Sequence, residues 1–276
     1  MMRLMPIDLP KLASMQKILS DSAGYETSME DELEYFRTTN PKSWFAAVAD
    51  SDIPIGFIRS FSQGPDWTLG EIFVSQESAH RTETARVLGM AFLKENNFEK
   101  GHRLRFDVSK FDIDINRALQ ELGLSDEKKE FLYFEMPLRL ADATQPTLPV
   151  IRDSDYADIS EALVNLHPVT LLEITDWVQN NQLRVSKNGE SIVSVAQLVF
   201  YTDSVEIVRF ATKKSDLRKG NAQILLSNIC AEMSNLRYKK IFLKVESIRQ
   251  PAISCYKKMG FQEITSKAQV WHSKWF

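Results

Sequence analysis

The fold is decided by residues 205–226, which read VEIVRFATKKSDLRKGNAQILL. Apolar and β-branched residues at the start of this stretch predict a strand, and the charged segment after them predicts a loop that opens into a helix. Gly220 and Ala222 at that opening let a ligand approach the backbone closely. The unpaired N–H groups of a helix start favour a phosphate, and Arg218 and Lys219 add positive charge there. An ordinary helix start remains an alternative explanation of the same residues.

The elements around this stretch follow the same order as elements earlier in the chain. In each half the sequence pattern predicts first a helix, two antiparallel strands and a third strand. A polar loop, a second helix and a fourth strand follow, and a short helix that ends in glycine leads to a closing strand. Val108 and Gly123 are 15 residues apart, and so are Val245 and Gly260. Spacing this regular indicates a duplicated unit. Helices between strands, behind an antiparallel front section, predict a mixed α/β sheet flanked by helices in each half.

The predicted elements of the two halves have similar lengths. In the first half they are helices at 9–19 and 83–95 and strands at 44–49, 54–61, 67–74 and 103–108. In the second half they are helices at 156–166 and 221–236 and strands at 183–187, 191–201, 205–212 and 240–245.

A polar, proline-bearing connector separates the two halves. It reads RLADATQPTLP over residues 139–149. Its prolines discourage a continuous helix and suit an extended linker. We therefore expect a first domain at residues 1–139, a linker at 140–148 and a second domain at 149–276.

The composition excludes several classes of protein. A chain of 276 residues and 31.7 kDa suits two domains of modest size. Hydrophobic residues make up 43% and charged residues 26%, which excludes a disordered, collagenous or disulfide-scaffold chain. A formal charge of −3 offers no overall positive field to nucleic acid, and no stretch approaches the ~18 apolar residues of a membrane span.

Cysteine and histidine usage bears on the redox compartment and on metal binding. Cys230 and Cys255 are too few for a disulfide framework or a four-thiolate zinc site, and they fit a reducing compartment. The four histidines form no i,i+4 pair, so we expect no metal. We expect a cytoplasmic protein that has neither nucleic acid nor a membrane as a partner.

A second stretch carries a resemblance to a known family. FLKV at 242–245 predicts a strand, and AISCYKKMGF follows at 252–261. With residues 205–226, these segments resemble the GNAT family of N-acetyltransferases, whose pattern runs from a strand into R/Q-x-x-G-x-G/A and a helix, then to a strand, N-x-x-A and Y-x-x-x-G-F. The matching positions are LRKGNA at 217–222, RQPA at 249–252 and YKKMGF at 256–261. The resemblance covers residues 149–276 and implies two tandem GNAT-like α/β domains, each with a mixed, mostly antiparallel sheet flanked by helices.

Two positions depart from the family pattern. Leu217 stands where the family usually has Arg or Gln, which removes a side-chain contact to a pyrophosphate but leaves the backbone cradle. Arg249 stands where the family often has Asn, and it adds a cation that could reach a phosphate or an acidic substrate. Neither departure abolishes the site by this reasoning.

The resemblance implies acetyl-CoA as the acetyl donor and an amine as the acceptor. It also implies that the strands before the phosphate loop and before Tyr256 part, so that the pantetheine arm pairs with backbone groups near Phe210 and Thr212. The cofactor-binding residues that it implies are Phe210, Ala211, Thr212, Leu217, Arg218, Lys219, Gly220, Asn221, Ala222, Arg249, Ala252 and Tyr256.

Two side chains are candidates for catalytic proton transfer. A lysine-like amine, with a pKa of ~10.4, must lose a proton before it attacks near neutral pH, so a base or a water chain is needed. Glu206 lies 14 residues before Gly220, where the family's histone acetyltransferases have their catalytic glutamate; the alternative is a solvated glutamate or one paired with Arg209. The Tyr256 phenol could give a proton or a hydrogen bond to the departing thiolate, or pack against the sheet.

The first half lacks the corresponding groups at equal spacing. Thr82 falls at the position of Gly220, and Leu119 falls at the position of Tyr256. The threonine Cβ hinders a phosphate from approaching the backbone, and leucine cannot act as an acid. We therefore expect a degenerate GNAT-like copy that supports the second half or offers a docking surface to a protein.

These observations predict an N-acetyltransferase that acts on a primary amine of a protein or peptide by direct attack. Backbone N–H groups would stabilise the tetrahedral intermediate. A small-molecule amine acetyltransferase and a CoA-binding pseudoenzyme that acts through protein contacts remain alternatives, and Leu217 and Arg249 keep the second one open. Glu173 and Asp176 could attract an amine, although exposure is the default for both. Tandem family members also occur among effectors that bacteria deliver into host cells, so host delivery stays open beside the cytoplasm.

Overall fold

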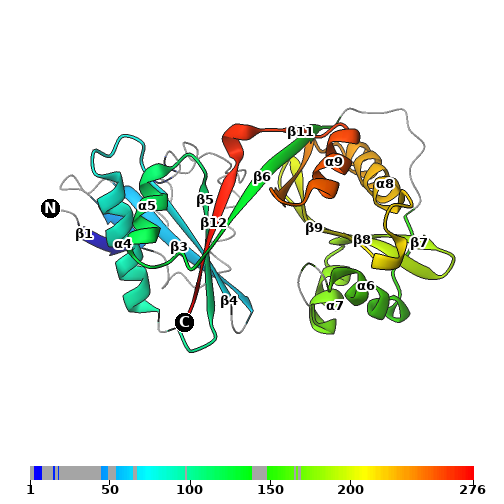
Figure 1. Ribbon diagram of the computed structural model, residues 1–276, viewed down its shortest axis with the longest axis horizontal. Helices are drawn as coiled ribbons and strands as arrows, with labels where there is room; N and C mark the ends of the chain where they lie inside the picture. Colours follow the sequence, from blue (N-terminus) through cyan, green and yellow to red (C-terminus); the bar gives the residue numbers. More distant parts are fainter. Residues whose placement is uncertain are drawn as a thin grey trace. The chain divides into compact units, whose positions relative to one another are not determined.

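The computed structural model describes residues 3–7, 15, 18, 45–48, 54–64, 67–96, 98–138, 148–164, 166 and 169–276. The chain forms two compact units: unit 1 comprises Met1–Leu132 with Thr265–Phe276, and unit 2 comprises Tyr133–Ile264 (Figure 1). Apart from residues 15, 18 and 148, the helix expected at 9–19 and the linker expected at 140–148 lie outside the described residues. Within the described part of the chain, no helix is long and apolar enough to cross a membrane.

Unit 1 contains a mixed sheet whose core faces two helices, α4 (Arg81–Glu95) and α5 (Ile113–Glu121). Its described strands follow the order β1 (Arg3–Pro6), β2 (Phe45–Val48), β3 (Pro54–Gly64), β4 (Trp67–Val74), β5 (Arg103–Ser109), β12 (Gln269–Trp275) and β6 (Glu127–Pro137). The first four strands pair antiparallel, and β4 pairs parallel with β5. Leu104 and Phe106 of β5 pack against Phe92 and Leu119 of the helices, which fixes both helices over the sheet.

The last strand of the chain lies in unit 1. β12 pairs antiparallel with β5 along the whole length of both strands. It also pairs antiparallel with β6, over the first part of β6. Its His272 is fully buried, and the two ring nitrogens bond to Asn116 Oδ1 at 2.6 Å and Ser125 Oγ at 2.9 Å. The sequence predicts that this strand closes the second half; the structure places it in unit 1, because its side chains complete the core beside α5.

Strand pairing rather than chain order defines the two units. β6 contributes residues up to Leu132 to unit 1 and residues from Tyr133 to unit 2. The domains predicted at residues 1–139 and 149–276 are each continuous along the chain, and this division stays a prediction.

Unit 2 contains the strands and helices expected for the second half. Its strands follow the order β6, β10 (Lys240–Glu246), β9 (Ser204–Thr212), β8 (Ser191–Phe200) and β7 (Leu183–Asn188), with β11 (Gln262–Glu263) pairing β6. Its helices are α6 (Tyr156–Leu163), α7 (Leu171–Gln179), α8 (Asn221–Asn235) and α9 (Gln250–Lys258). β7, β8 and β9 pair antiparallel, and β9 pairs parallel with β10. This mixed, mostly antiparallel sheet flanked by helices is the fold class that the sequence predicts.

The two faces of the unit 2 sheet carry different helices. The Arg209 guanidinium lies over the ring of Trp177 in α7, 4.8 Å from its centroid. The ring of the next residue, Phe210, contacts Tyr256 of α9 at 6.3 Å between centroids. Because successive residues of a strand point to opposite faces, α7 and α9 cover opposite faces of the sheet. Figure 1 shows α6 beside α7 and α8 beside α9, so each face has a pair of helices.

Candidate active site

A gap opens between the parallel strands β9 and β10. Their ladder runs from Ser204 and Lys240 to Ile207 and Leu243. Both strands continue beyond that last pair, and no further pair joins them, although the structure describes every residue of both. The resemblance to the GNAT family implies this parting of the strands. It leaves an edge of β9 whose backbone groups can pair with an extended ligand.

The gap begins beside a β-bulge in β9. Arg209 lies opposite Gln197 and Ile207 lies opposite Leu198, so Val208 is an extra residue that the ladder with β8 skips. A bulge leaves its residue out of the strand pairing and aims it away from the sheet. Val208 directly follows the last β9 residue that pairs with β10, and its backbone therefore lies at the mouth of the gap. Val208 could not be identified from the sequence, because no glycine or proline marks the bulge.

The loop between β9 and α8 presents unpaired backbone amides. Gly220 is the N-cap of α8 with φ +83°, and Arg218 has φ +63°. The amides of Arg218, Lys219 and Gly220 donate no hydrogen bond to a described residue. A Cβ built at Gly220 would meet nothing within 4 Å, so the space above this backbone is open. Successive amides of this kind at a helix N-terminus form an anion-binding concavity.

Asp216 fixes the shape of this loop. Its carboxylate accepts a bond from Lys219 Nζ at 2.9 Å, and its carbonyl accepts one from Asn221 Nδ2 at 3.2 Å. The bond from Lys219, followed by one from Ser215, lowers the pKa of the Asp216 carboxyl. Arg218 is exposed and forms no ion pair with a described residue, so it leaves a cation at the concavity. The loop therefore suits a phosphate or pyrophosphate.

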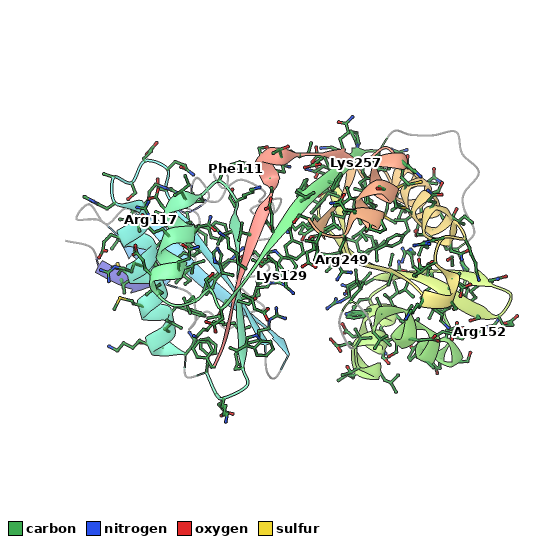
Figure 2. The ribbon with its side chains drawn as sticks, in the orientation of Figure 1. Phe111, Arg117, Lys129, Arg152, Arg249 and Lys257 are labelled. Carbon is green, nitrogen blue, oxygen red and sulfur yellow. The ribbon has the colours of Figure 1, made fainter. Side chains whose placement is uncertain are left out.

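The other predicted cofactor residues lie in β9, in the loop before α8 and at the start of α9. Thr212 Oγ1 lies 2.8 Å from Ser194 Oγ, which holds the end of β9. Leu217 is 53% exposed and offers an apolar contact rather than a charge. Arg249, labelled in Figure 2, is the N-cap of α9, and its Nε lies 3.4 Å from Glu246 Oε2. β9 carries Phe210, Ala211 and Thr212. The loop and the first turn of α8 carry Leu217, Arg218, Lys219, Gly220, Asn221 and Ala222. The start of α9 carries Arg249 and Ala252.

Lys213 anchors the start of the loop to α6. Its side chain is 7% exposed, and Nζ contacts Asp158 Oδ1 at 2.5 Å and Glu161 Oε2 at 2.9 Å. Burial opposes the charge, but the hydrogen bonds to the two carboxylates outweigh it and raise the pKa of Lys213. The bond from Lys213 lowers the pKa of Asp158. Sequence reasoning missed this link, because a lysine in a charged loop gives no sign of burial.

Tyr256 is buried among aromatic rings on the α8–α9 side of the sheet. Its ring contacts Phe134 at 6.2 Å, Phe210 at 6.3 Å and Phe261 at 6.0 Å between centroids. Burial raises the pKa of the Tyr256 phenol, which stays neutral at physiological pH. The hydroxyl has no hydrogen bond to a described residue, so it is available to a ligand. The geometry accommodates both the packing role and the proton-donor role.

Glu206 lies in β9 with both carboxylate oxygens engaged. Tyr201, in the turn between β8 and β9, donates its hydroxyl to Oε2 at 3.0 Å. Lys244 Nζ lies 3.5 Å from Oε1, and the Glu206 side chain is 14% exposed. Glu206 thus has an ion pair with Lys244, and the pairing with Arg209 that the sequence left open stays a prediction. Glu206 lies opposite Phe242 in the ladder, and the period-two alternation of β10 identifies Lys244 as its neighbour on the same face.

Glu206 shares a face of the sheet with Arg209. Val199 pairs with Glu206 and Gln197 pairs with Arg209 in the ladder between β8 and β9. Val199 and Gln197 are two residues apart on one strand and so point to the same face. Glu206 therefore lies on the face that α6 and α7 cover, and Tyr256 lies on the other.

Two further acids that the sequence singled out have structural partners. Glu173 accepts bonds from the Thr170 amide at 2.7 Å and from the Thr170 hydroxyl at 2.8 Å, which closes a capping box at the start of α7. Asp176 accepts a bond from Asn180 Nδ2 at 3.0 Å. In the described part of the chain, no group of three or more His, Cys, Asp or Glu side chains is placed so that it could hold a metal ion.

Unit 1 differs at the start of the helix that corresponds to α8. α4 begins at Arg81 after the N-cap His80, two residues earlier than the equal spacing that matched Thr82 to Gly220. The Arg81 guanidinium donates to the carbonyls of Val74 at 2.6 Å and Ser75 at 2.8 Å. It also pairs with two carboxylates at the start of α5, those of Asp112 and Asp114. Arg81 therefore ties the end of β4 to α5.

Other equivalent positions of unit 1 resemble unit 2 in part: β4 and β5 also have no pair beyond Gly70 and Phe106. The ladder between β3 and β4 has no register shift between Gly56 and Ser62, so β4 has no bulge where β9 has Val208. Leu119 is fully buried in α5, and its carbonyl accepts from the Leu124 amide as the carbonyl of Tyr256 does from Phe261. The equal spacing that matched Leu119 to Tyr256 thus agrees with the backbone of both helices.

Three comparisons relate this geometry to known proteins. Residues 154–261 match the model of the acetyltransferase (GNAT) family. No curated protein matches the chain by sequence. A GCN5-related N-acetyltransferase from Sphaerobacter thermophilus has a similar structure, with 12% identity, a TM-score of 0.78, and 99% of this chain and 95% of that chain covered. A tandem GNAT protein from the clavulanic acid biosynthesis pathway matches with 10% identity, a TM-score of 0.63, and 100% of this chain and 98% of that chain covered.

At these identities the structural similarity concerns the fold. A third similar structure is an acetyltransferase of the GNAT family from Colwellia psychrerythraea, with 10% identity, a TM-score of 0.62, and 100% of both chains covered. The similarity to these structures extends over both units, whereas the family model matches a segment that lies in unit 2.

Proposed function

Because residues 154–261 form an acetyltransferase domain of the GNAT family, we propose that unit 2 transfers the acetyl group of acetyl-CoA to a primary amine by direct attack. The observation that carries the proposal is the open edge of β9. It begins at the bulge of Val208, follows the gap to Thr212, and leads into the unpaired amides before Gly220. A strand edge that could bind the pantetheine arm and a loop that could bind the pyrophosphate thus follow one another along the chain.

The predicted residues have distinct roles in holding the cofactor. The amides of residues 218–220 and the first turn of α8 would bind the pyrophosphate, with Arg218 supplying charge. Backbone groups of Phe210 and Thr212 would pair with the pantetheine arm as an added strand. Leu217, Arg249 and Ala252 would border the arm where the loop and α9 approach it. Acetyl-CoA supplies the thioester, an acetyl group already activated for attack.

The proton steps divide between the two faces of the sheet. The amine nitrogen forms a bond to the acetyl carbonyl carbon, and the bond from that carbon to sulfur breaks. Glu206 accepts the proton of the amine, directly or through water, and Tyr256 gives a proton or a hydrogen bond to the sulfur. The backbone N–H at Val208 would stabilise the oxyanion between these events. In this proposal the proton of the amine goes to Glu206 on one face of the sheet, and the proton for the sulfur comes from Tyr256 on the other face.

The acceptor that we propose is a primary amine on a protein or peptide, with a small-molecule amine as the alternative. Release of the CoA thiol, measured with peptides, amino acids and polyamines as acceptors, tests this. The proposal predicts release that depends on the amine and falls strongly in Tyr256→Phe. Acetyl-CoA binding without transfer to any acceptor would contradict it and would favour a CoA-binding pseudoenzyme.

Unit 1 has a supporting role in this proposal. Its strands β4 and β5 also have no pair beyond Gly70 and Phe106. Arg81 joins the end of β4 to the start of α5. The guanidinium uses carbonyls at the end of β4 that an added strand would need. We therefore infer that unit 1 binds no acetyl-CoA and that it supports unit 2 or docks a protein.

A further inference from the structure

The two oxygens of the Glu206 carboxylate have different partners. The Tyr201 hydroxyl donates to Oε2 at 3.0 Å, and Lys244 Nζ lies 3.5 Å from Oε1. A hydrogen bond between N–H and an oxygen is ordinarily about 2.7–3.2 Å long, so the contact with Lys244 is an ion pair without a tight hydrogen bond. Tyr201 therefore makes the closer and more directional of these two contacts.

The two partners lie toward opposite ends of the ladder between β9 and β10. Glu206 and Phe242 form the last pair but one of that ladder, beside the gap. Tyr201 lies in the turn before β9, away from the gap, whereas Lys244 directly follows Leu243, the last paired residue of β10. Tyr201 thus holds Oε2 from the end away from the gap, and Oε1 is the oxygen on the side of the opening.

Aromatic packing fixes the ring of Tyr201. The ring stacks on Phe242 with centroids 5.9 Å apart, and Phe242 stacks in turn on Tyr133 at 5.4 Å. Phe242 and Tyr133 are both buried. The Tyr201 amide also donates to the Ser204 carbonyl at 2.9 Å, which closes the turn. Because a tyrosine has few side-chain torsions, a stacked ring on a fixed backbone keeps its hydroxyl in one place.

A carboxylate in a fixed position suits a general base. A carboxylate oxygen has more than one lone-pair position, so Oε1 can take a proton while Lys244 stays beside it. In the proposed reaction an N–H bond of the amine breaks and its proton bonds to Oε1, while Tyr201 keeps its own proton and its bond to Oε2. A reacting group that is misplaced by about 1 Å can cost about 100-fold in rate, so the bond that positions Glu206 affects the rate.

We propose that Tyr201 is a positioning residue that directs the Glu206 carboxylate to the acceptor amine of a protein or peptide. This inference rests on the proposed acetyl transfer, in which Glu206 is the base. Tyr201 acts through Glu206 and touches neither acetyl-CoA nor the acceptor. Its effect therefore falls on the proton step and not on the binding of acetyl-CoA.

The test uses the full-length protein, saturated with acetyl-CoA, and two peptide acceptors. One peptide carries a lysine, and the other carries the same lysine with two fluorine atoms on the carbon next to the one that bears the amine. Fluorine withdraws electrons and lowers the pKa of the amine, so the fluorinated amine depends less on a base. In Tyr201→Phe, which keeps the ring, we expect kcat to fall about tenfold with the lysine peptide and less than about threefold with the fluorinated one.

Further measurements assign the effect to the pair of residues. The acetyl-CoA dissociation constant should stay unchanged in Tyr201→Phe. In a Glu206→Gln background, Tyr201→Phe should cause no further loss of kcat, because Tyr201 acts through Glu206. Tyr238→Phe is the control, because its ring contacts Phe200 at 6.0 Å and its hydroxyl bonds to no described residue. This control should leave kcat intact with both peptides.

The outcomes separate this inference from the proposed function. An unchanged kcat in Tyr201→Phe, an equal loss with both peptides, or a further loss in the Glu206→Gln background contradicts the positioning role and leaves the acetyltransferase standing. An unchanged kcat in Glu206→Gln contradicts Glu206 as the base, and the role of Tyr201 with it. Acetyl-CoA binding without transfer to either peptide contradicts the proposed acetylation of peptides, and this inference with it.

Discussion

Glu206 and Tyr256 lie on opposite faces of the unit 2 sheet. Glu206 points to the side of α6 and α7, with its carboxylate held by Tyr201 and Lys244. Tyr256 lies on the side of α8 and α9 among three aromatic rings. The sheet separates these two faces, and the gap between β9 and β10 is an opening in it. A thioester seated in that gap would have the proposed base Glu206 on one side and the proposed acid Tyr256 on the other.

Replacing Tyr256 by phenylalanine tests the acid. The ring contacts remain, so stability and acetyl-CoA affinity should change little. Loss of the proton donor should lower kcat by about 100-fold. Steady-state thiol release gives kcat, and calorimetric titration gives the affinity. An unchanged kcat would show that Tyr256 only packs against the sheet.

Replacing Gly220 by aspartate tests the phosphate cradle. The new carboxylate crowds and repels a pyrophosphate, so acetyl-CoA affinity should fall at least tenfold, as measured by calorimetry. The positive φ of Gly220 costs a side chain about 1 kcal/mol of stability. Gly189→Asp is a matched control, because Gly189 also has positive φ and an open surrounding but lies in the turn between β7 and β8. Equal loss of affinity in both variants would place the phosphates elsewhere.

The ion pair of Lys213 predicts a defined pH dependence of stability. Lys213→Met leaves Asp158 and Glu161 without their buried cation and should lower the free energy of unfolding by about 2 kcal/mol at neutral pH. The pKa of Asp158 is lowered in the folded state, so its contribution is present above the unfolded pKa and is lost as the pH falls through the folded one. The difference between wild type and variant should therefore shrink in acid.

Urea unfolding at neutral and acidic pH measures this difference. Lys239→Met is the control, because it removes an exposed pair with Asp203 and should cost less than about 1 kcal/mol. A stability gap for Lys213→Met that does not narrow with falling pH would show that packing rather than charge sets its role.

His272 predicts an acid sensitivity of unit 1. Burial, together with Lys128, lowers its pKa from 6.5 to about 4. The unfolded chain then binds a proton that the folded one refuses, so stability falls as the pH drops from 6.5 to about 4. His272→Gln, which keeps hydrogen-bonding groups but does not titrate, should unfold with a flatter pH profile over this window. Parallel profiles for both proteins would rule out His272 as the source.

Local sequence patterns predicted most elements but not their long-range partners. The strand and helix around Gly220 follow from residue type and spacing, because glycine is the residue that takes positive φ without strain. The place of β12 beside β5 depends on contacts such as His272 with Asn116, which are 156 residues apart. The bulge at Val208 and the partner of Glu206 depend on strand register, which no single segment contains. The contacts of Arg81 could not be predicted, because the N-cap of α4 lies two residues before the position that equal spacing gives.

We infer that unit 2 holds the acetyl-CoA site and that Arg81, which bonds to the carbonyls at the end of β4, keeps acetyl-CoA out of unit 1. Calorimetric titration of acetyl-CoA into the full-length protein tests it most directly. We predict a single site per chain, whose affinity falls at least tenfold in Gly220→Asp. Two sites per chain would contradict the role of Arg81 in unit 1, and no binding would contradict the acetyl-CoA site of unit 2.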